Sequence, residues 1–363
     1  MAGFRDSLLE ISENALLHNL NYFKNLINHS ANLILVLKAN SYGAGAINIA
    51  RLFENEIRIE YYAVASISEG IELRQAGVKK KIIILSPNAD RFSELTTHKL
   101  EPVIINNINL KRFITQLGTN KDYPAHLNFD TGMHRVGFRE NEIEEVSRLL
   151  NETNCIKITT IFSHYSGSGS LVFDEFTAEQ SEKFNAMFNQ LSSFLTYQPK
   201  THMNNSSGLE RFNKDQNTLH RLGLGLYGHS VENEALNNVF VWKTKVAHIQ
   251  WVEKGESVSY NRSWIAPKRS KIATVFVGYA DGLNRRLSNG KWSLRIGDNL
   301  LPIVGSICMD LSMVDATNID LQPGDTLTIL NSVKDIKDMA KVLGTISYEI
   351  QTSISSRIER LYV

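Results

Sequence analysis

The sequence has few of the features that mark an exported, membrane-bound or nucleic-acid-binding protein. Only two of its 363 residues are cysteines, Cys155 and Cys308, which argues against a disulfide scaffold and suits a reducing compartment. Its longest apolar runs, such as "KIIIL", are far too short to span a bilayer, and the first twenty residues hold no apolar segment of signal-peptide length. The 39 Lys and Arg residues nearly balance the 38 Asp and Glu residues, so no polyanionic partner is indicated. We therefore expect a cytoplasmic protein with neither a membrane nor a nucleic-acid partner.

Short apolar runs recur through the first part of the chain and alternate with segments of helical spacing. One such segment has Phe184, Met187, Phe188 and Leu191 at positions i, i+3, i+4 and i+7. Strands that alternate with helices form parallel sheets, and eight such units predict a (β/α)₈ barrel. The eight runs are "LILVLK" near 33, "YYAVAS" near 61, "KIIILS" near 81, "EPVII" near 101, "AHLNFD" near 125, "KITTIFSH" near 157, "THMNNS" near 201 and "RLGLGLYG" near 221.

The pattern changes near residue 235. The segments "VFVWKTKVAHIQWV", "KIATVFVGYA" and "DTLTIL" are rich in strand-forming residues, and turns with Gly, Asn and Asp link such segments. The predicted fold is therefore of the α/β class. A TIM-type barrel over residues 1–235 is followed by a mostly β domain over residues 236–363.

Polar side chains gather where the predicted barrel strands end, which is where barrel enzymes carry their chemistry. The loops after strands seven and eight often bind phosphate, and here they offer the Ser206 hydroxyl and a glycine-containing turn. A lysine opposite such a turn can form a Schiff base with a phosphorylated aldehyde, for which pyridoxal phosphate is the obvious candidate. Taken singly, the lysine could be a solvated loop residue and the histidines could be core residues. The residues at these ends are Lys38, Tyr42, Arg135, His164, His202, Asn205, Ser206, Arg221, Gly223 and Leu224.

Several motifs along the whole chain carry a family resemblance. They are "VLKANSYGAG", "DTGMHRVGF", "HMNNSSGLERF", "RLGLGLYG", "VSYNRSW", "VGYADGLNRRLSN" and "PIVGSICMDLSMVD". Together they resemble the motifs of alanine racemases, a pyridoxal-phosphate-dependent family of fold type III. The first resembles the family's cofactor-lysine signature, which usually ends YGHG, so Ala44 departs from it.

The resemblance implies a role for each residue and a homodimer with composite active sites. Lys38 would hold the cofactor and act as one acid–base group, and Tyr279 from the other subunit would act as the second. Arg135 would bind the substrate carboxylate, and Met309 from that same subunit would complete the substrate pocket. No metal is implied. The other implied cofactor contacts are Tyr42, His164, Asn205, Ser206, Arg221, Gly223 and Leu224, with Arg221 facing the pyridine nitrogen and His164 linking Arg221 to Tyr279.

The implied reaction is the interconversion of L-alanine and D-alanine. It would supply D-alanine for cell-wall peptidoglycan. Racemisation removes a proton from one face of the substrate and returns it to the other, so two opposed bases need no movement. An arginine opposite the pyridine nitrogen stays protonated and leaves that nitrogen neutral, which favours racemisation over transamination. Alternatives are a racemase that also accepts serine, a fold-type III decarboxylase, and a small pyridoxal-phosphate carrier that would lack the β domain.

Besides Ala44, three positions depart from the family pattern. Asn128 stands where many members have a lysine that is carbamylated and orients the arginine corresponding to Arg135. Ser356 stands where a tyrosine often crowds the substrate pocket, so the sequence predicts L-serine as a secondary substrate. His134 replaces a glycine. We expect another acceptor, such as an anion, an acidic side chain or water, to replace the carbamate beside Arg135.

Overall fold

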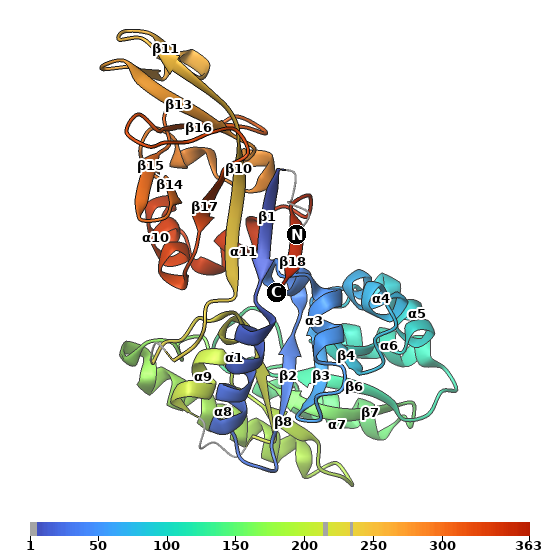
Figure 1. Cartoon of the computed structure of the whole chain (residues 1–363). Coiled ribbons are helices and arrows are strands. Elements are labelled where there is room, and N and C mark those ends of the chain that lie inside the picture. The colour runs from blue at the N-terminus through green and yellow to red at the C-terminus, as the bar shows by residue number, and fades with distance from the viewer. Residues whose placement is uncertain (1–5, 213–216, 233–234) are drawn as a thin grey trace. The chain divides into compact units, whose positions relative to one another are not determined.

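The structure, a computed structural model, describes residues 6–212, 217–232 and 235–363. The chain forms two units, which Figure 1 colours along the sequence. One unit comprises residues 18–41 and 45–236, and the other comprises the chain up to Leu17, residues 42–44 and residues 237–363. The division falls within helix α1 (Glu13–Leu26).

The first unit is built on an eight-stranded parallel sheet in the order β8-β7-β6-β5-β4-β3-β2-β9. The last strand pairs with the first of the barrel, with Leu219 opposite Asn32, and the sheet curls into a nearly closed barrel. All eight predicted strands and the predicted (β/α)₈ barrel are confirmed. The strands are β2 (Asn32–Val36), β3 (Ile59–Val64), β4 (Lys81–Ile84), β5 (Glu101–Ile104), β6 (Tyr123–Asn128), β7 (Ile156–Phe162), β8 (Lys200–His202) and β9 (Leu219–Leu222).

Helices follow the barrel strands and bury one apolar side each. In α8 (Asp174–Ser192) the buried residues include Phe184, Met187 and Leu191, as the helical spacing predicts. The α4 helix (Ile67–Gln75) begins with a capping box between Ser66 and Glu69. The other helices of this unit are α3 (Ala46–Leu52), α5 (Phe92–His98), α6 (Asn107–Leu117), α7 (Ile143–Asn151) and α9 (Ser206–Arg211).

The second unit is mostly β, as predicted. Its main sheet has the order β15-β14-β17-β10-β1-β18, and β13 pairs with both β10 and β16. Strand β1 lies antiparallel to β10 and parallel to β18, a pairing that the sequence did not predict. Helices α10 (Val333–Leu343) and α11 (Ser347–Ser353) complete the unit. The strands are β1 (Ser7–Ile11), β10 (Phe240–Val252), β13 (Ser270–Val275), β14 (Ser293–Ile296), β15 (Asn299–Pro302), β16 (Ser312–Asp315), β17 (Thr326–Leu330) and β18 (Glu359–Tyr362).

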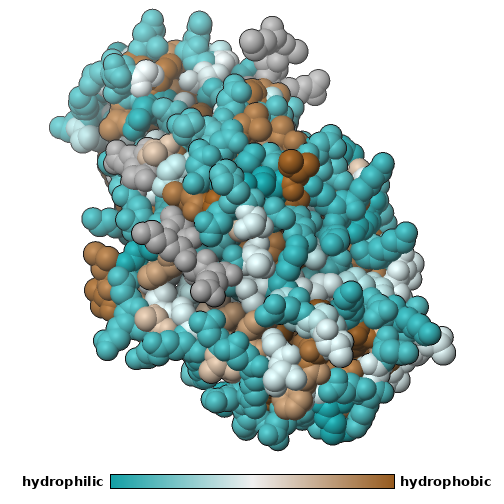
Figure 2. All heavy atoms as spheres, turned by 90° about the horizontal axis from the view of Figure 1, so that it is seen from below, coloured by the Kyte–Doolittle hydropathy of each residue, from teal (hydrophilic) through white to brown (hydrophobic). Residues whose placement is uncertain are grey.

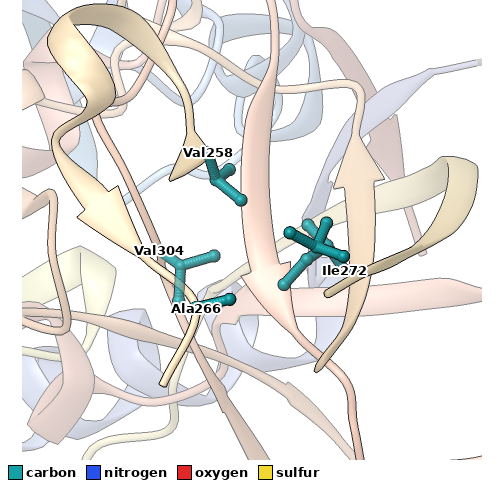
Figure 3. Packing of buried hydrophobic residues seen from close by; sticks show 5 residues of the cluster. Val258, Ala266, Ile272 and Val304 are labelled. Atoms are coloured by element: carbon teal, nitrogen blue, oxygen red, sulfur yellow. The ribbon is translucent and has the colours of Figure 1, made fainter. Parts of the chain in front are cut away.

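A separate apolar cluster fixes a small ribbon in this unit. The ribbon consists of β11 (Ser257–Val258) and β12 (Trp264–Ile265). Figure 3 shows Val258 and Val304 directed toward Ala266 and Ile272, and Val252 belongs to the same cluster. Full burial of a Val or Ile side chain stabilises a fold by roughly 1.5–3 kcal/mol, so this cluster holds the ribbon against β13.

One face of the molecule is largely hydrophilic. On the face in Figure 2, hydrophilic atoms predominate and apolar ones form small separate groups. Among the described residues, no helix is both long enough and apolar enough to cross a membrane.

Candidate active site

Lys38 begins a short left-handed turn directly after β2. The φ angles of Ala39, Asn40, Ser41 and Tyr42 are 53°, 52°, 56° and 55°. Left-handed backbone costs roughly 1–2 kcal/mol for each residue with a Cβ, so other contacts must hold the turn. The Ala39 amide donates to Glu69 Oε1 at 2.7 Å, and the Ser41 and Tyr227 hydroxyls lie 2.5 Å apart. Such backbone strain is characteristic of functional sites, where it positions a side chain.

The surroundings of the Lys38 amine disfavour its protonated, positively charged form. Burial lowers its pKa most, and the positive charges of Arg135 and Arg221 lower it further, while Glu69 opposes the shift. A lower pKa leaves more of the amine neutral, which is the form that attacks a carbonyl group. Glu69 was not anticipated as a site residue, although the spacing of Ser66 and Glu69 is a capping-box signal in the sequence.

We expect Lys38 to titrate at a lower pH than an exposed lysine. Lys334 is a matched reference, because its ion pair with Asp338 raises its pKa. The measurement is an NMR titration of the protein after mild reductive methylation with ¹³C-formaldehyde, with Lys38→Arg and Lys334→Arg variants to assign the signals. Equal midpoints for the two lysines would contradict the expected shift.

Arg221 lies in the barrel on β9 and is held by several acceptors. Its Nη2 donates to the carbonyls of Ser163 at 2.8 Å and Met203 at 2.9 Å, and to His164 Nδ1 at 3.0 Å. Its Nη1 donates to the ring nitrogen Nδ1 of His202. Burial and the charge of Arg221 hold the pKa of His164 well below its ordinary value. His164 is therefore neutral at pH 7, and because its Nδ1 accepts from Arg221, its proton is on Nε2.

Ser206 and the glycine turn after β9 converge, as the sequence predicts. The Ser206 hydroxyl accepts hydrogen bonds from the amides of Gly223 and Gly225, both at 3.1 Å. A Cβ on Gly225 would lie 2.4 Å from the Phe23 ring, so the close approach of this backbone requires glycine. Asn205 caps α9, accepting from the Gly208 amide at 2.9 Å. Leu224 begins the 3₁₀ turn Leu224–Tyr227. One hydroxyl and nearby backbone amides form a set that suits a phosphate group.

Arg135 lies in a tight loop after β6. It is exposed, and its charge acts on both Lys38 and His164. The loop closes where the Phe138 amide donates to the Asn128 carbonyl at 2.8 Å, while the Asn128 side chain is buried.

His134, in the same loop, has an explanation that the sequence did not provide. It adopts a φ of 53°, a conformation that glycine reaches without strain. Its Nδ1 lies 2.8 Å from Asp130 Oδ2, and its amide donates to the same carboxylate at 2.9 Å. Burial alone would raise the pKa of Asp130. The hydrogen bonds from the side chain and the amide of His134 outweigh burial, so the pKa of this carboxyl is lowered. The histidine thus compensates for its backbone strain with a charge-assisted hydrogen bond.

Tyr42, Gly43 and Ala44 belong to the β-rich unit. Tyr42 is buried, and its ring centroid lies 6.0 Å from that of Tyr348. The carbonyl of Gly43 accepts from Arg360 Nε at 3.1 Å, and that of Ala44 accepts from the Tyr362 hydroxyl. A Cβ on Gly43 would lie 2.4 Å from the Gln351 carbonyl oxygen, so this approach requires glycine.

Tyr279 and Met309 lie on two loops that are bonded to each other in the β-rich unit. The Tyr279 amide donates to the Cys308 carbonyl at 3.0 Å, and the Ala280 amide donates to the Met309 carbonyl at 3.0 Å. A Cβ on Gly278 would lie 2.2 Å from the Met309 carbonyl oxygen, which explains the glycine before the tyrosine. The two residues are 43% and 54% exposed.

Arg357 ties these two loops to the C-terminal segment. It pairs with Asp281 at 2.9 Å and with Asp310 at 2.7 Å. In the sequence, nothing in the spacing of "GYADG", "CMD" and "SSRIER" reveals that these segments meet at this arginine. Ser356, beside it, is exposed.

The chain matches two family models that together cover most of its length. The model described as "Alanine racemase, N-terminal domain" matches residues 11–231, and "Alanine racemase, C-terminal domain" matches residues 239–362. An alanine racemase of Fusobacterium nucleatum is 34% identical over 98% of this chain and 99% of its own length. "Alanine racemase 2" of Caldanaerobacter subterraneus is 33% identical over 99% of this chain and 95% of its own length.

Solved structures agree with these relatives. An alanine racemase of Clostridium difficile 630 superposes with a TM-score of 0.93 at 29% identity, covering 99% of this chain and 96% of that one. An alanine racemase of Bartonella henselae with covalently bound pyridoxal phosphate has a TM-score of 0.86 at 26% identity, covering 99% of this chain and 100% of that one. The family models, the relatives and the fold thus agree over nearly the whole length, and the chain belongs to the alanine racemase family.

Proposed function

We propose that this enzyme interconverts L-alanine and D-alanine with pyridoxal 5′-phosphate as cofactor and with Lys38 and Tyr279 of two subunits as opposed bases. The observation that carries the proposal is the set of groups at the barrel rim. It combines an amine with a lowered pKa at Lys38, a hydroxyl with backbone amides at Ser206, and Arg221. The covalently bound pyridoxal phosphate of the Bartonella relative supports the choice of cofactor.

The chemistry of these groups fits that cofactor. A neutral Lys38 amine suits its aldehyde, and the Ser206 hydroxyl with the amides around Gly223 and Leu224 suits its phosphate. Tyr42 and Asn205 are further contacts expected around the phosphate region, and Arg221 is expected at the pyridine nitrogen. When bound, the cofactor acts as an electron sink that makes the substrate's α-proton removable.

The proton transfers are assigned to two side chains of this enzyme. Lys38 Nζ takes or returns the proton on one face of the substrate, and the phenolic oxygen of Tyr279 does so on the other. Arg221 can only donate hydrogen bonds and keeps its own proton, so it does not protonate the ring nitrogen. The Nε2–H of His164 offers a donor that would stabilise a tyrosine phenolate. Arg135 would orient the substrate carboxylate.

The assembly and location follow the same reasoning. Tyr279 and Met309 are exposed on the β-rich unit, and in a twofold dimer each subunit would present them to its partner's barrel. The proposed enzyme is a cytoplasmic homodimer that supplies D-alanine for peptidoglycan.

The direct test is to incubate the purified holoenzyme with L-alanine. D-alanine should form and no CO₂ should be released, and the reverse reaction should reach the same equilibrium. Release of CO₂ without D-alanine would identify a decarboxylase instead.

We expect Ser356 to set side-chain selectivity. An added hydroxyl is rejected by only about 10²-fold even in a hydrophobic pocket, so a pocket without the usual tyrosine should admit L-serine as a secondary substrate. Ser356→Tyr should lower kcat/KM for L-serine more than for L-alanine. Thr352→Tyr, which adds the same phenol at an exposed position of α11, is the matched control. An unchanged ratio in Ser356→Tyr would show that residue 356 does not face the substrate.

A further inference from the structure

A continuous chain of hydrogen bonds runs through the barrel wall from Arg221 to a buried carboxylate. Beyond the Arg221–His202 contact, His202 Nε2 lies 3.1 Å from Thr160 Oγ1, and Thr160 Oγ1 lies 2.7 Å from His126 Nδ1. His126 Nε2 lies 3.1 Å from Glu101 Oε2. Five strands that follow one another along the chain, β5, β6, β7, β8 and β9, thus contribute one residue each.

This chain is buried throughout. Glu101 is 6% exposed, His126 and Thr160 are 0%, His202 is 1% and Arg221 is 5%. Barrel interiors are usually filled with branched apolar side chains, and burying polar groups is costly unless each finds a partner. Five connected polar residues in this place therefore indicate a purpose beyond packing, because an apolar set would stabilise the barrel at lower cost.

When both histidine rings are neutral, the two ends of the chain set the direction of every hydrogen bond. A guanidinium only donates and a carboxylate only accepts. Arg221 therefore donates to His202 Nδ1, so the neutral His202 carries its proton on Nε2 and donates it to Thr160. Thr160 in turn donates to His126 Nδ1, and His126 donates through Nε2–H to Glu101. Burial, with Arg221 the next contributor, holds the pKa of His202 well below its ordinary value, which agrees with a neutral ring.

The groups around His126 leave this direction unchanged. The Tyr61 ring meets His126 edge-on with centroids 5.6 Å apart, and Lys81 Nζ lies 5.0 Å from the centre of the Tyr61 ring. Burial and the charges of Glu101 and Glu60 raise the pKa of Tyr61, so its phenol stays neutral. The Thr159 hydroxyl donates to the Ala125 carbonyl at 3.1 Å and lies 3.4 Å from His126 Nδ1.

We propose that Glu101 is a positioning residue for the reaction, acting through His126, Thr160 and His202 to keep an acceptor facing Arg221. With His202 locked as the Nε2–H tautomer, the Arg221 fork is held in one orientation from the barrel side. In the proposed function this orientation sets how the guanidinium would face the cofactor ring. The expected effect on catalysis rests on the proposed function. The predicted histidine tautomers are independent of that function.

Without Glu101, the chain loses the group that sets its direction. His126 could then carry its proton on Nδ1, Thr160 could donate to His202, and His202 could place its own proton against Arg221. Removal of such outer hydrogen-bond partners from metal-bound histidines lowers affinity or activity by roughly 10- to 100-fold. We expect kcat to fall about tenfold in Glu101→Met, with KM changed less than twofold. Glu101→Gln keeps an acceptor oxygen and should recover most of the loss.

The test is ¹⁵N NMR of the histidine rings in the holoenzyme, with kcat and its pH profile measured on the same samples. Signals are assigned by their loss in His126→Asn and His202→Asn. Glu60→Gln is the matched control, since Glu60 also lies on a barrel strand but bonds to Lys200 at 2.6 Å. The wild type should show Nε2–H tautomers for both histidines, and Glu101→Met should shift the His202 signals while Glu60→Gln does not.

Three results would overturn the proposal. These are an Nδ1–H tautomer of His202 in the wild type, unchanged His202 signals in Glu101→Met, or an equal loss of kcat in Glu101→Met and Glu60→Gln. If Glu101→Met does not fold, the proposal is still tested by the tautomers of the wild-type histidines and by the kcat and the His202 signals of Glu101→Gln. The NMR signals report the tautomers without any catalytic turnover. A failure of the racemase proposal would therefore be recognised separately: the predicted tautomers would be present, but no D-alanine would form.

Discussion

Lys38→Ala is expected to lose at least about 10³-fold in kcat, because general acid–base catalysis by one group contributes roughly 10²–10⁴-fold and the proposed cofactor attachment is lost as well. The reason lies in the environment of the amine, whose pKa is lowered by burial and by two arginines. Racemisation of L-alanine, followed by loss of optical rotation or by coupled D-alanine oxidation, measures the effect.

Lys38→Arg is the informative control for this variant. It keeps the length and charge of the side chain, but a guanidinium stays protonated and cannot attack an aldehyde or accept a proton. It should therefore be as inactive as Lys38→Ala, whereas Lys334→Ala should retain wild-type activity. Borohydride reduction of the holoenzyme and peptide mapping should place the pyridoxyl group on Lys38. A label on another lysine, or substantial activity in Lys38→Arg, would reject the assignment.

Mixing the inactive Lys38→Ala and Tyr279→Phe chains is expected to restore activity. If each site takes Lys38 from one subunit and Tyr279 from the other, every mixed dimer has one intact site and one doubly defective site. Random pairing of equal amounts makes half of the dimers mixed, so about a quarter of the wild-type activity should return. The exposure of Tyr279 and Met309 on their own unit motivates this expectation.

The experiment needs independent proof that subunits exchange. Chains with two different affinity tags, purified in sequence, provide it and also isolate the mixed dimers, which should have about half of the wild-type activity. Each variant mixed with itself is the control. If both tags are recovered together and activity is still absent, the two side chains do not belong to one shared site.

The barrel strands were predictable because local composition is enough to define them. Runs such as "LILVLK" and "KIIILS" are apolar on both faces, as strands buried in a parallel sheet must be. The order of the strand ends then placed Lys38, His164, Ser206 and Arg221 at one rim, and the contacts of Arg221 with His164 and of Ser206 with Gly223 agree with that order. The family motifs supplied the roles.

Other features depended on contacts between distant parts of the sequence. Strand β1 finds its partners more than two hundred residues away, with Leu9 opposite Trp242 and Arg360, and a five-residue strand gives no signal of such pairing. The bonding of Arg357 to Asp281 and Asp310 likewise joins loops that no spacing rule connects. The compensation of the strained His134 by Asp130 became visible only with the backbone angle.

The sequence by itself determined the fold class and the residue types at the barrel rim, because hydrophobic periodicity and motif spacing are local properties of the chain. Only the tertiary structure decided that Glu101, His126 and Thr160 continue the contacts of Arg221. The side chains come from separate strands, and their meeting depends on the register between those strands and on the curl of the barrel. In the sequence each looks like an ordinary strand residue, and their common hydrogen bonds arise only once the sheet has formed.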